Sequence, residues 1–138
     1  MISRYSRKEL KDIWSEENKY KIWLEVEIAA AEAMEKFKII PKGVSSIVKK
    51  KGKIKVKRIH DIEAKVKHDV IAFLTSITEQ AGIKARYLHQ GMTSSDVLDT
   101  SFNIQLMQSG KIILKDIDKI LIVLKRQAKK YKMTPCIG

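Results

Sequence analysis

Cysteine is almost absent from this sequence, because Cys136 is the only one in 138 residues. A disulfide framework and a zinc site of the Cys-x-x-Cys type both need more than one cysteine. Histidine is scarce too, and the three present, His60, His68 and His89, include no His-x-x-x-His pair. We therefore expect no metal ion, no disulfide and a reducing, cytoplasmic setting.

Long hydrophobic runs are also missing, so the sequence predicts no membrane-spanning helix. The first residues carry Arg4, Arg7 and Lys8 with no apolar stretch after them, which is not the pattern of a secretory signal. Apolar residues still make up 44% of the chain and charged residues 32%, as in folded globular proteins. The length is sufficient for one ordinary domain with a real core.

Acidic residues are too few to balance the basic ones, and the net charge is +12. Residues 42–67 hold ten Lys or Arg against Asp61 and Glu63, and residues 111–132 hold eight against two acidic residues. Such segments are typical of a solvated lysine-rich surface, but an anionic small-molecule substrate, a partner subunit or nucleic acid would also suit them. Aromatic residues are not interleaved with the basic segments, so a platform that stacks on single strands lacks support.

Helical periodicity covers almost the whole sequence, and Pro41 and Pro135 fall where it stops. Lys53 to Lys57 alternates apolar and polar residues but has no second strand to pair with, so we expect an extended connector there. A break is expected near His68-Asp69. The apolar spacing predicts helices over about residues 6–14, 15–38, 44–51, 59–82 and 94–131.

Side chains that cap helices are predicted at three of these starts. Ser6 with Glu9 forms a capping box, Ser15 precedes two glutamates, and Ser94 or Ser95 opens the last helix. The glutamates of the second helix are expected outside its apolar stripe: Glu25, Glu27, Glu32 and Glu35.

The fold class that follows is all-α. We expect residues 1–93 to form an N-terminal helical domain and residues 94–138 to begin a helical-bundle domain that this chain does not complete. The last helix is long and amphipathic with no later segment to pack against, so we also expect self-association through its apolar face.

Two polar clusters are candidates for binding or catalysis. Thr93-Ser94-Ser95-Asp96 places hydroxyls and first-turn backbone N–H groups at a helix start, where a carboxylate or phosphate binds well, although plain capping explains the same residues. His68 and Asp69 adjoin at the expected break, where side chains point into a cleft or merely cap a helix. The sequence has no Gly-rich phosphate loop and no nucleophile elbow.

Blocks spaced along the whole chain resemble one enzyme family. The blocks are residues 1–7 (MISRYSR), 13–18 (IWSEEN), 23–27 (WLEVE), 40–41 (IP), 67–73 (KHDVIAF) and 89–100 (HQGMTSSDVLDT). Together they are similar to bacterial adenylosuccinate lyases of the fumarase–aspartase superfamily. That resemblance implies an all-α, cytoplasmic, homotetrameric enzyme of purine biosynthesis that needs no cofactor.

The resemblance also implies which residues bind the substrate. Arg4 and Tyr5 match a pair that contacts the nucleotide, chiefly at its phosphate. Thr93 and Ser94 match residues that bind a carboxylate of the succinyl group.

A second block implied by the resemblance lies at Lys67, His68 and Asp69, which matches an Arg-His-Asp block that contacts substrate. This chain has Lys67 where Arg is usual, and a lysine cannot make the planar bidentate contact of a guanidinium. His89 matches a histidine near the site, and we keep His68 and His89 as auxiliary catalytic candidates.

The family reaction eliminates fumarate from adenylosuccinate, leaving AMP, and from the succinylated aminoimidazole carboxamide ribotide. A base removes the proton beside a succinyl carboxylate, and an acid protonates the departing nitrogen. The family acid lies in a Gly-Arg-Thr-His-Gly block and its base on a later loop. Neither is found among these 138 residues, so we expect the chain alone to be inactive.

Two other hypotheses remain open from the sequence alone. One is a basic helical module that binds nucleic acid, which the charge of residues 42–67 favours. The other is a purely structural helical module whose polar clusters only cap helices.

Overall fold

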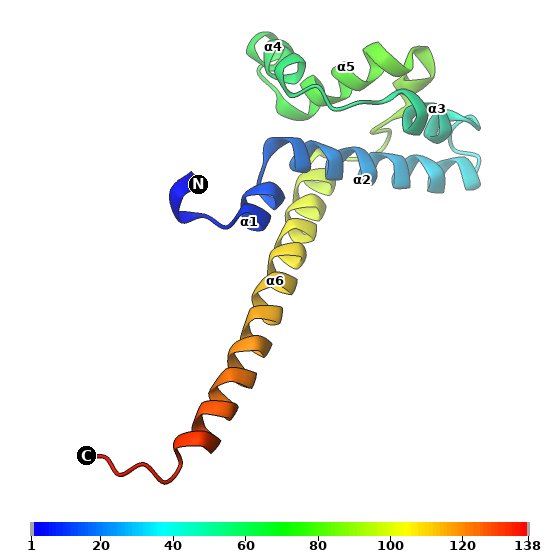
Figure 1. The fold of residues 1–138 in the computed structure, drawn as a ribbon. Helices are drawn as coiled ribbons and strands as arrows, with labels where there is room; N and C mark the ends of the chain where they lie inside the picture. Colours follow the sequence, from blue (N-terminus) through cyan, green and yellow to red (C-terminus); the bar gives the residue numbers. More distant parts are fainter. Residues whose placement is uncertain (1, 138) are drawn as a thin grey trace. The chain divides into compact units, whose positions relative to one another are not determined.

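A computed structural model describes residues 2–137, and every regular element within that range is a helix (Figure 1). The predicted all-α fold class is therefore confirmed. The elements are the 3-10 helices η1 (Ser3–Tyr5) and η2 (Ile83–Tyr87) and the α-helices α1 (Lys8–Ile13), α2 (Glu16–Lys36), α3 (Val44–Lys51), α4 (Val56–Val66), α5 (Asp69–Ala81) and α6 (Ser94–Tyr131). None of the helices in residues 2–137 is long and apolar enough to span a membrane.

The chain divides into two compact units, Met1–Gln105 and Leu106–Gly138. The first holds the core and all of the candidate site residues. In the second, large apolar side chains of α6 are exposed, among them Ile113, Leu114, Ile117, Ile120, Leu121, Ile122 and Leu124. The domain boundary after residue 93 and the self-association of this face stay predictions.

The core of the first unit is built around three aromatic rings. Tyr20 and Trp23 on α2 meet edge to face with their centroids 5.2 Å apart. Phe73 on α5 stacks on Tyr20 at 5.9 Å and meets Trp23 edge to face at 5.5 Å. All three are at most 2% exposed. Further buried apolar side chains close the core around them: Val44, Val48, Ile59, Ile62, Val70, Ile77, Ala85, Leu88 and Val97.

The helix starts only partly follow the predicted caps. Ser15 caps α2 as predicted, with its Oγ accepting from the Asn18 N–H at 3.2 Å. The predicted capping box at Ser6 is wrong. Helix α1 begins after Arg7 and has no side-chain cap, because the Ser6 hydroxyl donates to the Ile2 carbonyl instead. The last helix begins at Ser94, so the residue before it is Thr93 rather than the predicted Ser94 or Ser95.

Two other helix boundaries differ slightly from the prediction. α2 ends at Lys36, ahead of Pro41, because Lys38 takes a φ of 61° and Ile39 donates its N–H back to the Met34 carbonyl. The extended connector is shorter than predicted, since α4 already begins at Val56.

Glu35 joins the end of α2 to the start of α3. Its Oε1 accepts from the Ser45 N–H at 2.7 Å, one of the first-turn donors that α3 cannot satisfy itself. That bond, with further N–H groups of Gly43 and Val44, lowers the pKa of the Glu35 carboxyl below its ordinary value of 4.5.

Replacing Glu35 by glutamine is expected to weaken the dependence of stability on acid pH. A lowered carboxyl pKa contributes stability above the unfolded value of 4.5 that is lost as pH falls through the folded value. A neutral glutamine contributes none of that dependence. Thermal unfolding between neutral and acid pH measures it, with Glu25→Gln, an exposed glutamate on the same helix, as the control. Equal acid sensitivity of wild type and Glu35→Gln would contradict the assignment.

Ser76→Ala is expected to leave the melting temperature unchanged or raise it. The Ser76 side chain is 1% exposed, and its hydroxyl has no hydrogen-bond partner among the described residues. Removing such a group relieves a desolvation cost of about 1–3 kcal/mol, and alanine favours helix. The control is Ser101→Ala, which removes an equally buried hydroxyl that donates to the Leu98 carbonyl at 2.9 Å. A larger loss for Ser76 than for Ser101 would show that Ser76 has a partner.

Candidate functional site

The start of α5 holds the second of the predicted substrate blocks. α4 ends at Val66, and Lys67 takes a left-handed conformation with a φ of 58°. His68 is the residue before α5, and its Nδ1 accepts from the Ile71 N–H at 3.4 Å. The His68 side chain is 48% exposed, and its Nδ1 also lies 3.5 Å from the Asp69 carboxylate. The expected break at His68-Asp69 is thus confirmed, and it also gives His68 a capping role.

The start of α6 is closed by its own carboxylate. Asp96 accepts from the Thr93 N–H at 2.8 Å, and the Asp96 N–H points back at the Thr93 carbonyl at 3.1 Å. Helix geometry leaves the N–H groups of Ser94 and Ser95 without intrahelical partners. These two donors and the neighbouring hydroxyls can hold a carboxylate, although the charge of Asp96 at the same helix end reduces the attraction.

Asp69 lies beside the first turns of α6. It lines a hollow of about 340 Å³ with Lys19, Trp23 and five α6 residues: Leu98, Asp99, Ser101, Phe102 and Gln105. The Lys19 ammonium lies 5.2 Å from the Trp23 ring centroid, so the hollow contains one cation and two carboxylates. Such a set suits a polar ligand that carries both charge signs.

Lys67 lines a different hollow, of about 390 Å³, with His60, Glu63 and Ala64. The two side chains that flank His68 in sequence therefore face separate hollows. The cause is the left-handed turn at Lys67, which reverses the chain between α4 and α5.

Arg4 and Tyr5 lie at the beginning of the chain, in η1. The Arg4 guanidinium sits 4.8 Å from the Tyr5 ring centroid, and both side chains are exposed. Neither lines a hollow described above. Of the predicted binding residues, Lys67 and Asp69 line separate hollows, and Arg4, Tyr5, Thr93 and Ser94 line neither of these two.

A buried carboxylate that the sequence did not reveal lies under His89. Glu27 accepts from the His89 N–H at 2.9 Å and lies 2.6 Å from the His89 Nδ1. Its side chain is fully buried, and the prediction that Glu27 lies outside the apolar stripe of its helix is wrong. The sequence does contain a signal for this burial, because Trp23, Glu27 and Ala31 follow one another at four-residue spacing and so share one face of the helix.

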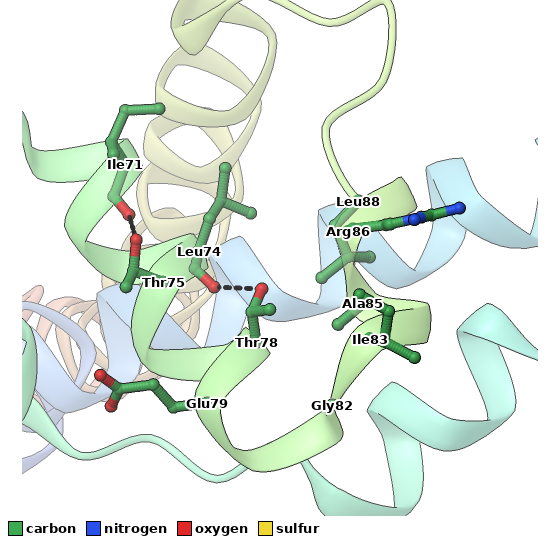
Figure 2. A pocket seen from close by; sticks show the side chains of 10 residues that line it. All are labelled: Ile71, Leu74, Thr75, Thr78, Glu79, Gly82, Ile83, Ala85, Arg86 and Leu88. Atoms are coloured by element: carbon green, nitrogen blue, oxygen red, sulfur yellow. Dashed lines mark hydrogen bonds between the residues drawn. The ribbon is translucent and has the colours of Figure 1, made fainter.

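An apolar groove of about 490 Å³ runs along α5 and η2. Figure 2 shows why it is apolar: the hydroxyls of Thr75 and Thr78 turn back to the Ile71 and Leu74 carbonyls, at 2.7 and 2.8 Å. In the same view Arg86 extends away from these residues, and its guanidinium donates to the Tyr87 hydroxyl. The residues that line this groove do not form a catalytic arrangement. Within residues 2–137, no group of three or more His, Cys, Asp or Glu side chains could hold a metal ion.

Comparison with known proteins identifies relatives along the whole chain. A family model described as Lyase matches residues 3–138. The adenylosuccinate lyase of Thermotoga maritima is 45% identical over 138 residues, that of Streptococcus mutans 43%, and that of Bacillus subtilis 39%. Each match covers all of this chain and 32% of the relative. The chain therefore spans about a third of the length of the curated relatives it matches.

A solved structure shares the fold. The fumarate lyase of Mesorhizobium sp. BNC1 superposes with a TM-score of 0.87 over 97% of this chain and 33% of that chain, at 23% sequence identity. At that identity the likeness concerns the arrangement of helices alone.

Proposed function

Since the chain belongs to the lyase family whose model matches residues 3–138, we propose that it forms the N-terminal part of an adenylosuccinate lyase. Such an enzyme eliminates fumarate from adenylosuccinate, leaving AMP, and from the succinylated aminoimidazole carboxamide ribotide. The observation that carries the proposal is the 39–45% identity to enzymes of that name along the entire chain. Nothing in the fold or the comparisons supports a nucleic-acid-binding module.

In this proposal the chain binds substrate and leaves the main proton transfers to residues elsewhere in the enzyme. His68, at the start of α5, accepts a backbone N–H at its Nδ1, and His89, after η2, contacts Glu27 through its Nδ1. The nearby carboxylates are Asp69, 3.5 Å from the His68 Nδ1, and the buried Glu27, so both Nδ1 atoms already have structural partners. His68 and His89 are therefore assigned auxiliary roles.

Thr93 and Ser94 are proposed to bind a succinyl carboxylate. The elimination places extra negative charge on the carboxylate beside the carbon that loses its proton. Hydroxyls and N–H groups fixed at the start of α6 would stabilise that charge more strongly in the transition state than in the substrate. Arg4 and Tyr5 are proposed to contact the nucleotide phosphate.

Lys67, His68 and Asp69 are proposed to contact substrate from the start of α5. The positive charge of Lys67 attracts an anionic group, but an ammonium does so without a fixed fork. The separate hollows that Lys67 and Asp69 line fit a site that further polypeptide completes. A cytoplasmic homotetramer is proposed for the whole enzyme, with the exposed apolar face of α6 in its helical bundle.

An assay of fumarate release tests the proposed function. The full-length protein that carries this chain is incubated with adenylosuccinate, and the absorbance change is followed. We expect turnover by the full-length protein and none above background by the 138-residue chain. No turnover by a folded full-length protein would overturn the proposal, and turnover by the chain alone would overturn the assignment of proton transfer to other residues.

A further inference from the structure

The Glu27 carboxylate is buried in the middle of α2, a 21-residue helix, with its side chain 0% exposed. Burying a carboxylate is costly unless hydrogen bonds compensate for the lost water. A leucine at this position would fill the apolar stripe at no such cost. The groups that this carboxylate binds should therefore explain why it is there.

Both oxygens of Glu27 are engaged by a single residue 62 positions later in the chain. Oε2 accepts from the backbone N–H of His89 at 2.9 Å, and Oε1 lies 2.6 Å from its Nδ1. His89 has a φ of 63°, a left-handed conformation that residues other than glycine rarely adopt. Contact with backbone and ring at once fixes both the turn and the orientation of the imidazole.

The contact also determines where the imidazole proton lies. An ionised carboxylate only accepts hydrogen bonds, so Nδ1 must carry the proton. Nε2 is then the ring nitrogen left for other partners, in a side chain that is 15% exposed. The His89 carbonyl accepts from the Met92 N–H at 3.2 Å, so the fixed turn leads directly to Thr93 at the start of α6.

We propose that Glu27 is a positioning residue that clamps His89 in its Nδ1–H form, presents Nε2 toward the substrate and anchors the turn leading to Thr93. The substrate part of this inference rests on the proposed function. The clamp itself rests on the two contacts and the burial of Glu27.

The clamp is tested on the 138-residue chain with ¹⁵N-labelled histidine. Long-range ¹H–¹⁵N correlations at alkaline pH, where an imidazole is neutral, distinguish a protonated ring nitrogen from a bare one. We expect Nδ1 of His89 protonated and Nε2 bare. In Glu27→Gln the amide oxygen can still accept the His89 N–H, which turns the amide NH₂ toward Nδ1. The proton then moves to Nε2, so the two variants should show opposite tautomers.

Two further variants control this experiment. Glu27→Asp keeps a group that only accepts, and it should keep the wild-type tautomer. Glu35→Gln changes a carboxylate of the same helix that bonds to Ser45, and it should leave His89 unchanged. A bare Nδ1 in the wild type, or the same tautomer in wild type and a folded Glu27→Gln, overturns the clamp. If Glu27→Gln does not fold, the wild-type and Glu27→Asp spectra decide.

Turnover by the full-length enzyme tests the positioning role separately. Glu27→Gln is expected to lower kcat/KM at least tenfold, with Glu27→Asp restoring part of the loss. An unchanged kcat/KM in an enzyme with the inverted tautomer would overturn the role toward substrate and leave the lyase activity established. A wild-type enzyme without turnover would overturn the proposed function, while the tautomer result would still stand.

Discussion

Replacing Phe73 by alanine is expected to lower the free energy of unfolding by about 3–5 kcal/mol, the range for emptying a large buried aromatic site. Phe73 is 0% exposed and stacks on Tyr20 with an interplanar angle of 8°. Its ring also meets Trp23 edge to face, so it joins α5 to both aromatic residues of α2. Loss of the ring removes these contacts between α5 and α2 and leaves a cavity in the core.

Urea denaturation followed by circular dichroism measures this loss. Phe37→Ala is the matched control, because Phe37 is 72% exposed and follows the end of α2. Exposed substitutions of this kind usually change stability by less than about 0.5 kcal/mol. Equal effects at Phe73 and Phe37 would contradict the aromatic core described above.

The features that the sequence predicted well are those set by neighbouring residues. The all-α class follows from periodicity, the cap at Ser15 from one side chain and the first turn it faces, and the end of α5 from Gly82. The break before His68 is likewise local. Each depends on interactions within about one helical turn, which the order of residues specifies directly.

The misplaced caps show where local rules compete. Ser6 has the spacing of a capping box with Glu9, but its hydroxyl donates instead to the Ile2 carbonyl, four residues earlier. At α6, Asp96 bonds the Thr93 N–H, which selects Thr93 over Ser94 as the residue before the helix. Hydroxyl side chains have several partners within reach, and the sequence does not rank them.

The clamp at Glu27 could not be predicted, because its partner is distant in the chain. Its place on the apolar face is visible in the sequence, but a glutamate there suggests exposure until His89 supplies two donors. For the candidate site, the resemblance identified residues such as Lys67 and Asp69, yet only the left-handed turn between them shows that they face separate hollows.

In the proposed full-length lyase, the double variant Thr93→Ala, Ser94→Ala is expected to lower kcat by about 10²–10³. That is the usual effect of removing a donor aimed at charge that develops in the transition state. The melting temperature should change little, because the Asp96 carboxylate still accepts from the backbone N–H of residue 93. Steady-state kinetics with adenylosuccinate and thermal unfolding of the same preparation give the two measurements.

The matched control is Thr75→Ala, Ser46→Ala, which likewise removes one threonine and one serine hydroxyl, here from helices α5 and α3. Both donate to backbone carbonyls, of Ile71 and Gly43, so their loss is expected to leave kcat unchanged. If Thr93 and Ser94 only begin a helix, their variant should keep its turnover. If they bind the succinyl carboxylate, turnover falls while stability holds. The variant's kcat should then fall by a larger factor than its KM rises, because the negative charge that these residues face grows along the reaction. The two measurements therefore separate a helix cap from a binding site made of the same residues.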